Sequence, residues 1–312
     1  MNDFNFACPV CRSELTAVSD NALHCNLDNI TFRQRDGIWR LLAPGAAHKY
    51  ARFIREYETV RLQEGRSSEN PAYYRTLPFH DLTGRRTEEW HIRARSFLTL
   101  LTNVLEPQSS VLSPQSSVLT VLDLGAGNGW LSNRLAEKGH AVTAVDLMVN
   151  TFDGLGAHIH YEHNFVAVQA EYDRLPLMDD QFDLVIFNAS FHYAVDYATT
   201  LTEACRVLRP EGKVVIMDTA VYHNPAAGQQ MVREREAQFQ KTYGFPSNAL
   251  PNENYLTYRR LDELAQQFNI RWQLYWPTPR WRWTIRRLRS ALRRRREPGQ
   301  LPLIVGTKRN VS

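Results

Sequence analysis

Ten residues, Val121-Leu-Asp-Leu-Gly-Ala-Gly-Asn-Gly-Trp130, are the strongest indication of fold in this chain of 312 residues. An apolar run typical of a β-strand ends at residue 124, and glycines then alternate with other residues at 125, 127 and 129. Glycine lets the backbone turn sharply and approach a ligand without a Cβ in the way. Backbone amides at the start of the following helix point into the same space. The stretch therefore predicts a strand–loop–helix unit that binds a nucleotide-like ligand.

The chain from residue 118 onward alternates apolar runs with helical patterns. Nearly continuous apolar strands separated by helices predict a mostly parallel sheet with helices on both faces, the Rossmann-like α/β class. A helical insert is expected within 223–258, and the last two strands, 270–276 and 301–307, are expected to form an antiparallel pair at the sheet edge. The residues before this region predict two helices, at about 48–64 and 88–105.

The spacing of the glycines distinguishes two kinds of ligand. Dinucleotide sites favour G-x-G-x-x-G, in which the third glycine packs helix against strand. Here the third glycine comes one residue early, and Trp130 stands at the expected position. Asp123 precedes the loop, and Asp146 ends the next strand, where a carboxylate can accept hydrogen bonds from both ribose hydroxyls. This arrangement favours an adenosyl ligand without a pyrophosphate and with a cationic amino-acid end; a turn without ligand is the less favoured alternative.

Four segments together resemble the class I S-adenosylmethionine (SAM) dependent methyltransferases of the broad type 11 family. They are LDLGAGNGW at 122–130, AVD at 144–146, EYDRLPLMDDQFDLVIFNASFHY at 171–193 and RVLRPEGKVVIMD at 206–218. The resemblance covers roughly a third of the chain and implies SAM as cofactor. It implies that Asp146 binds the ribose and that Asp123 orients the ammonium group. The residues that it assigns to SAM around the glycine loop are Asp123, Gly125, Ala126, Gly127, Asp146 and Leu147.

The resemblance also assigns residues after the third and fourth strands. Glu171 stands where the family often has an aspartate that accepts the adenine amino group, with Tyr172 beside it, and Asn188 ends the fourth strand at the rim of the site. The sulfonium is already a strong electrophile, so the protein mainly aligns the acceptor with the methyl group. His192 and Tyr193 are the candidate catalytic residues by position; aromatic packing over the pocket is the alternative.

The N-terminal segment is expected to form a small β-rich module. Its CPVC turn, its second turn near residue 25 and its DGI segment at 36–38 resemble zinc-ribbon or Trm-type modules that precede some methyltransferase domains. The fourth ligand departs from that pattern, because an aspartate stands where a cysteine is usual; His24 is a possible substitute. Three thiolates and a carboxylate can bind one structural Zn²⁺ tetrahedrally, and a ribbon that has lost its metal is the alternative. The expected ligands are Cys8, Cys11, Cys25 and Asp28.

Residues 280–296 contain nine arginines and no acidic residue. The net charge of +4 therefore conceals a body that is mildly acidic once this arm is set aside. Four apolar residues recur at helical spacing along it: Trp281, Ile285, Leu288 and Leu292. Such a helix can lie on an anionic membrane or bind RNA phosphates. The favoured expectation is that the apolar stripe packs on the domain and the arginines form a solvated face.

The composition is typical of a globular protein. Hydrophobic residues make up 43% of the chain and charged residues 22%, and neither a membrane-spanning run nor a secretory signal is visible, so a cytoplasmic location is expected. The expected function is SAM-dependent methylation of a small-molecule or lipid-like acceptor. The alternatives are an RNA methyltransferase that docks through the ribbon and the arm, and a non-catalytic SAM-binding regulatory module.

These patterns divide the chain into expected regions. The linker repeats PQSSVL at 107–112 and 114–119, and a duplicated surface loop is its simplest explanation. The regions are a zinc-ribbon-like module at 1–44, a helical extension at 45–106, the linker at 107–117, and a methyltransferase domain at 118–312 with the insert at 223–258 and the basic arm at 277–300.

Overall fold

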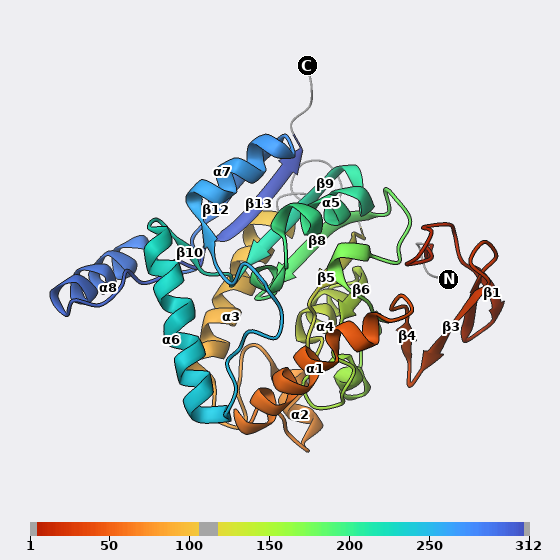
Figure 1. Cartoon of the computed structure of the whole chain (residues 1–312), viewed down its shortest axis with the longest axis horizontal. Coiled ribbons are helices and arrows are strands. Elements are labelled where there is room, and N and C mark those ends of the chain that lie inside the picture. The colour runs from red at the N-terminus through yellow and green to blue at the C-terminus, as the bar shows by residue number, and fades with distance from the viewer. Residues whose placement is uncertain (1–4, 106–117, 309–312) are drawn as a thin grey trace.

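The computed structural model describes residues 5–105 and 118–308, so the linker expected at 107–117 lies outside the described residues. Within those ranges, eleven strands form one sheet, in the order β1-β2-β3-β4-β7-β6-β5-β8-β9-β13-β12 (Figure 1). Helices cover both faces of its central part. The expected Rossmann-like α/β class is confirmed.

The centre of the sheet is parallel. Its strands are β5 (Thr120–Leu124), β6 (Ala141–Asp146), β7 (Val166–Gln169), β8 (Phe182–Asn188) and β9 (Leu208–Met217). The last two strands, β12 (Ile270–Tyr275) and β13 (Leu303–Lys308), pair antiparallel, and β13 also runs antiparallel to β9. Because β13 inserts between β9 and β12, the strand before the arm becomes the edge strand.

The two faces of the sheet bury separate cores, because successive strand residues point to opposite sides. On one face, Leu122 and Leu124 of β5 pack with α5 (Tyr197–Val207) and α7 (Tyr258–Gln267). On the other face, Val121 packs with helices that include α4 (Trp130–Glu137) and α3 (Thr87–Leu100), which continues as one π-helical turn, Leu101–Leu105. All five residues of β5 are buried, including the polar residues Thr120 and Asp123.

The N-terminal strands extend the same sheet instead of forming a detached module. These strands are β1 (Thr16–Ser19), β2 (Ala22–Cys25), β3 (Ile30–Arg35) and β4 (Ile38–Arg40). Strand β4 pairs in parallel with β7, with Trp39 opposite Val168. Apolar side chains of this segment, which we call the ribbon (residues 5–40), belong to the same buried cluster as the central strands.

The remaining helices lie around the carboxyl ends of the strands and beyond them. They are α1 (Ala46–Gln63), α2 (Pro71–Thr76), α6 (Pro225–Tyr243) and α8 (Arg280–Leu292). Two short strands, β10 (Val221–Tyr222) and β11 (Leu256–Thr257), pair with each other beside α6. Among the described residues, no helix combines the length and apolar character needed to cross a membrane.

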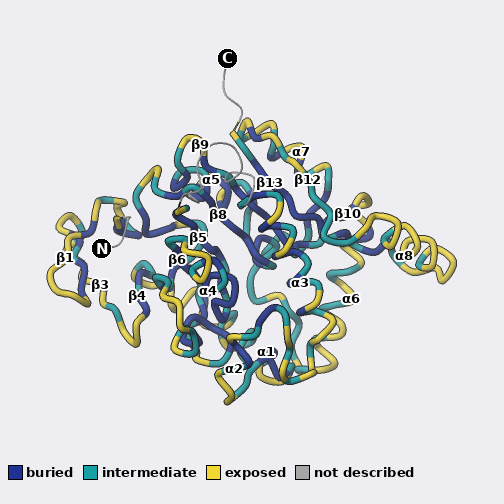
Figure 2. Tube along the Cα trace, turned by 180° about the vertical axis from the view of Figure 1, so that it is seen from behind, coloured by how far each residue is buried: buried dark blue, intermediate teal, exposed yellow. Residues whose placement is uncertain are grey.

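Helix α8 projects from the body, and Figure 2 shows it largely exposed. The expectation that its apolar stripe packs on the domain is wrong. The stripe residues are exposed by 59% at Trp281, 41% at Ile285, 62% at Leu288 and 77% at Leu292. None of the helix residues is buried by the part of the chain that the structure describes.

Candidate functional site

A cavity of about 350 Å³ lies at the carboxyl ends of β5, β6 and β8. In open α/β sheets this edge is where ligands bind. Eight of the nine residues expected to contact the cofactor line this cavity, and so do both candidate catalytic residues. The lining residues among those expected are Gly125, Ala126, Gly127, Asp146, Leu147, Glu171, Tyr172, Asn188, His192 and Tyr193.

The loop after β5 needs glycine at its first position. Gly125 has a φ of 76°, in the left-handed region. A Cβ built there would lie 2.3 Å from both the Cβ of Ser190 and the Oη of Tyr172. The amides of Gly125 and Ala126 both donate to the carbonyl of Val145. The loop is therefore held against β6, with bare backbone facing the cavity.

Asp146, at the end of β6, is already bound to backbone amides on both sides. Its Oδ2 accepts from the amide of Gly127 at 2.8 Å, and its Oδ1 accepts from the amide of Met148 at 2.7 Å. Burial raises the pKa of this carboxyl group. A carboxylate has roughly four lone-pair directions, so it can accept a further hydrogen bond from a ligand. The fixed orientation suits a pair of ribose hydroxyls.

Asp123 is the one expected cofactor residue that does not line the cavity. Its side chain is fully buried behind the glycine loop, where Oδ2 accepts from the hydroxyl of Ser132 at 2.8 Å. Its Oδ1 is buried without a hydrogen-bond partner among the described residues. Burial raises its pKa to about 7, and the nearby charge of Asp146 adds to the effect. A cationic ligand group above the loop would favour its ionised form.

Glu171 faces the cavity but is also bound by α1. Its Oε2 accepts from the hydroxyl of Tyr50 at 2.5 Å and from Nζ of Lys49 at 3.1 Å. Asn188 is only 5% exposed, and its Oδ1 has no hydrogen-bond partner within the described residues. A buried acceptor without a partner is costly, which fits a position where a ligand supplies the donor.

His192 and Tyr193 form a short 3₁₀ turn with Phe191 just beyond β8. Burial lowers the pKa of His192 to about 4, with Arg235 and Arg93 adding to the effect. Its Nδ1 is buried and lacks a hydrogen-bond partner among the described residues. The ring is therefore neutral at physiological pH and able to accept a proton.

The comparisons with known proteins agree on the central region. Residues 122–216 match the family described as a methyltransferase domain. The chain is 32% identical over 105 residues to malonyl-[acyl-carrier protein] O-methyltransferase of Buchnera aphidicola, a match that covers 33% of this chain and 40% of that protein. It is 36% identical over 98 residues to demethylmenaquinone methyltransferase of Mycobacterium marinum, covering 31% and 40%.

Residues 122–216 are a class I SAM-dependent methyltransferase domain. The chain spans about two fifths of the length of the curated relatives named above. Among solved structures, the YcgJ protein of Bacillus subtilis is similar, with a TM-score of 0.48 and 15% identity, covering 70% of this chain and 99% of that one.

Helix α1 supplies cavity residues that the sequence did not assign to the site. Tyr50, Phe53, Tyr57 and Arg61 all line the cavity, and Tyr193 packs edge-on against Phe53 and Tyr57, with ring centroids 6.1 and 5.9 Å apart. The sequence predicted a helix at about 48–64 that carries these aromatic residues. It did not indicate that this helix covers a ligand site.

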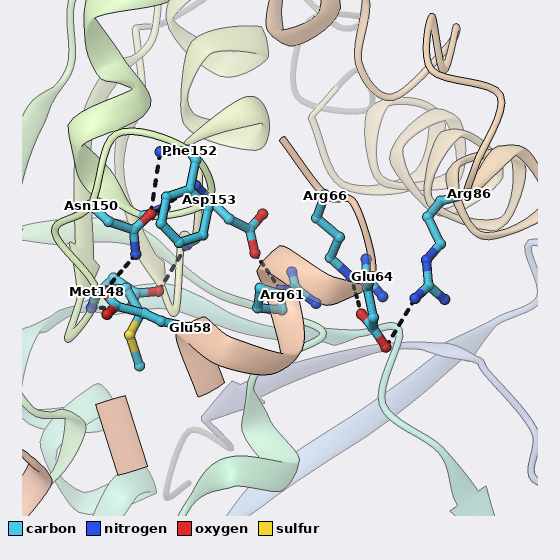
Figure 3. Close-up of polar contacts among 12 residues, drawn as sticks. Glu58, Arg61, Glu64, Arg66, Arg86, Met148, Asn150, Phe152 and Asp153 are labelled. Carbon is cyan, nitrogen blue, oxygen red and sulfur yellow. Dashed lines mark hydrogen bonds and ion pairs between the residues drawn. The ribbon is translucent and has the colours of Figure 1, made fainter. Parts of the chain in front are cut away.

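Polar contacts fix α1 to the rim of the cavity (Figure 3). Arg61 binds the carboxylate of Asp153, and Glu58 accepts from Nδ2 of Asn150 at 2.8 Å. Oδ1 of Asn150 in turn accepts from the amides of Phe152, Asp153 and Gly154, at 3.3, 2.9 and 3.0 Å. The loop after β6 and the helix are thus joined through side chains that are largely shielded from water.

The ribbon carries the second candidate site. The structure brings together the four expected metal ligands, whose ligand atoms all lie within 4.8 Å of one another: Cys8, Cys11, Cys25 and Asp28. Sγ of Cys11 is 3.5 Å from Sγ of Cys25, and Oδ2 of Asp28 is 3.1 Å from Sγ of Cys8. Tetrahedral bonds of about 2.0–2.3 Å to zinc impose separations of roughly this size. The donor set and its geometry therefore fit a closed metal site.

His24, the substitute considered for Asp28, turns away from the metal cluster. Its Nδ1 lies 3.0 Å from the hydroxyl of Thr31, on the exposed side of the hairpin. Burial raises the pKa of the Cys8 thiol to about 12, and the Asp28 carboxylate adds to the effect. A metal ion bound here would displace that proton, because zinc binds the thiolate.

Proposed function

We propose that this protein transfers the methyl group of SAM to a small, lipophilic acceptor that binds beneath α1. The observation that carries the proposal is the cavity in which the bare backbone of the glycine loop faces the carboxylate of Asp146. When bound, SAM supplies an electrophilic methyl group that needs no further activation. The protein has then to orient the two reactants and exclude water.

The proposed SAM site uses the residues around the two strand ends. Asp146 would accept hydrogen bonds from the ribose hydroxyls, and Asn188 would accept one at the rim. Asp123 would act from behind the loop on the ammonium group. For the adenine end we propose Glu171 and Tyr172, with Tyr50 holding the Glu171 carboxylate.

A second cavity of about 160 Å³ is the proposed acceptor chamber. It shares Phe53, Tyr57 and Tyr193 with the first cavity, and Phe239 and Phe245 also line it. The lining further includes five charged residues: Glu56, Arg61, Glu64, Arg66 and Arg235. The aromatic part of this lining favours an apolar or aromatic acceptor. The two curated relatives named above are named for malonyl-[acyl-carrier protein] and demethylmenaquinone, and a low-molecular-weight or carrier-bound acceptor is consistent with those names.

His192 is the proposed general base if the acceptor is a hydroxyl, and Tyr193 is proposed to close the chamber against α1. Because the pKa of His192 is lowered to about 4, the ring stays unprotonated as pH falls from 8 to 5. We therefore expect His192 to contribute no limb to the pH profile of kcat/KM between pH 8 and 5, and its protonation to lower kcat/KM only as pH approaches 4. A limb near pH 7 that persists without His192 would belong to Asp123, whose pKa is raised to about 7. A limb near pH 6.5 that disappears in His192→Gln would contradict the neutral, buried base.

For the ribbon we propose one structural Zn²⁺ held by its three cysteines and Asp28. A reducing compartment such as the cytoplasm would keep the thiols free to bind it. We further propose that the ribbon, the helical extension and the domain after residue 118 act as one unit, with α1 closing the SAM site.

The test begins with SAM binding. Asp146→Ala removes two charge-assisted hydrogen bonds to the ribose, so calorimetry should show SAM affinity reduced by at least about tenfold. Glu162→Ala is the matched control, because that carboxylate is 71% exposed on the same domain. Unchanged affinity in Asp146→Ala would contradict the proposed site.

The acceptor class is tested by isotope transfer. Purified protein is incubated with methyl-labelled SAM and a cell extract, which is then separated into lipid, RNA and small-molecule fractions. We expect label in the lipid or small-molecule fraction. Label in RNA alone would favour an RNA methyltransferase, and SAM binding without transfer to any fraction would favour a regulatory SAM-binding module.

A further inference from the structure

Helix α8 presents two faces of different character. At 3.6 residues per turn, the four exposed apolar side chains fall within roughly 60° of one another around the helix. These side chains, which we call the outer stripe, are Trp281, Ile285, Leu288 and Leu292, each at least 41% exposed. Isolated exposed apolar residues are ordinary, but a continuous stripe along one helix indicates an interaction surface.

The opposite face of α8 is the one that attaches to the protein. Trp283 lies roughly 200° around the helix from Trp281. Its Nε1 donates to the carbonyl of Pro298 at 2.9 Å, and its ring lies 5.7 Å from that of His223. Arg287, one turn later on the same side, approaches Glu297 at 3.7 Å. These contacts turn the outer stripe away from the body, so the domain itself does not cover it.

Arginines border the outer stripe on one flank. Arg282, Arg286, Arg289 and Arg293 fall in a row at roughly 80–140° from Trp281. All four are exposed. Their stems can lie along an apolar surface while the guanidinium groups reach outward to anions. The helix therefore combines an apolar face with adjacent positive charge and no acidic residue over 280–296.

We propose that α8 docks the protein on an anionic lipid bilayer, with the outer stripe inserted at the level of the acyl chains and the flanking arginines bound to lipid phosphates. A helix of this design lies in the plane of the interface. Nine arginines within 280–296 oppose pairing of this face with a second copy. RNA would satisfy the arginines but would leave four large apolar side chains in water. The proposal goes beyond methyl transfer and does not depend on it.

The docking site lies close to the proposed active site along the chain. After α8, the chain returns to the body at Gln300, whose backbone pairs with Val221, and Leu301 then lines the SAM cavity. A bilayer held at α8 would therefore be joined to the cavity wall by a short segment. This connection suits an acceptor that is drawn from a membrane, in keeping with the aromatic chamber proposed above.

Vesicle sedimentation with the full chain tests the proposal. Vesicles of phosphatidylcholine with phosphatidylglycerol should bind the protein, and vesicles of phosphatidylcholine alone should bind it at least about tenfold more weakly, since each arginine near an anionic surface contributes. Binding should weaken as salt concentration rises. No binding to either vesicle, or equal binding to both, would overturn the proposal.

Two sets of substitutions separate the apolar from the charged contribution. Changing the four outer-stripe residues to Ser should reduce binding to anionic vesicles by at least about tenfold, and changing the four flanking arginines to Gln should do the same. The matched control is Leu82→Ser with Leu98→Ser, because these residues are also exposed, by 53% and 50%, but lie elsewhere. The control should bind as the unaltered chain does.

RNA is the competing outcome. If the outer-stripe variant bound vesicles normally, insertion of the stripe would be refuted. If a single-stranded RNA bound the unaltered chain and the outer-stripe variant alike while vesicles bound neither, the helix would be an RNA contact. SAM affinity measured on every variant reports separately on the cofactor site. A failure of vesicle binding with normal SAM binding would therefore refute only the docking role.

Discussion

The ribbon and helix α8 are both attached at the margins of the sheet, yet they treat their apolar residues in opposite ways. The ribbon joins the sheet through β4, and its Trp39 and Phe32 are buried, at 8% and 5% exposure, in a cluster shared with the central strands. Helix α8 touches the body mainly through Trp283 and leaves its outer stripe in solvent.

This difference shows how similar sequence features acquire different roles. Both segments have unusual compositions, with thiols in one and arginines in the other. In the ribbon, the apolar residues are buried and therefore stabilise the whole domain. In α8, exposure makes them available to a partner. Substitutions in the two segments should therefore separate loss of stability from loss of binding.

The largest expected effect is at the junction of ribbon and sheet. Trp39→Ala should lower the free energy of unfolding by about 3–5 kcal/mol, because loss of this large buried side chain leaves a cavity beside Phe6 in the shared apolar cluster. Trp281→Ala in the outer stripe is the matched control and should change it by less than about 0.5 kcal/mol. Urea denaturation measures both. Equal effects would remove the distinction between the two segments.

Metal removal should have the next largest effect. At a free zinc concentration 100 times the dissociation constant, zinc binding would stabilise the folded chain by about 2.7 kcal/mol. A chelator should therefore lower the melting temperature, and Asp28→Ala should reduce both the zinc content and the effect of the chelator. Asp28→Cys should restore them. A melting temperature that is independent of zinc in the purified, metal-analysed protein would favour a ribbon that has lost its metal.

A smaller effect is expected where the ribbon and α5 share an ion pair. Arg12 binds Glu203 at 2.8 Å, but its side chain is 46% exposed, and Glu203 also keeps Arg206 at 2.9 Å. Arg12→Ala should therefore cost no more than about 1 kcal/mol. A loss of several kcal/mol in thermal denaturation would mean that this contact, and not the shared apolar cluster, holds the ribbon in place.

The smallest effect on stability should come from α8. Changing all four outer-stripe residues to Ser should change the free energy of unfolding by less than about 0.5 kcal/mol, because exposed side chains contribute few stabilising contacts to the folded state. Differential scanning calorimetry of this variant, run beside the unaltered chain, would test it. A marked destabilisation would show that the stripe is structural and would weaken the contrast with the ribbon.

Local spacing was enough to predict much of the fold and many of the residues that line the cavity. The glycine loop, Asp146 at the end of the next strand and the alternating strands and helices are each visible as short patterns in the sequence. The metal cluster was predictable for the same reason, because two tight turns bring its ligands together. The role of α1 was not, since Tyr50 meets Glu171 across a separation of 121 residues.

The amino-acid sequence by itself therefore determined which reactive and charged groups this protein has: the glycine loop, the carboxylates, the thiols and the arginines. It also determined their spacing along the chain. The tertiary structure determined where in the molecule these groups lie and what they contact. It added the ribbon to the sheet edge, laid the aromatic face of α1 over the cavity, and turned the apolar side of α8 outward. The reason is physical. A periodic pattern specifies which side chains share a face, but the surface that this face meets depends on contacts between residues far apart along the chain.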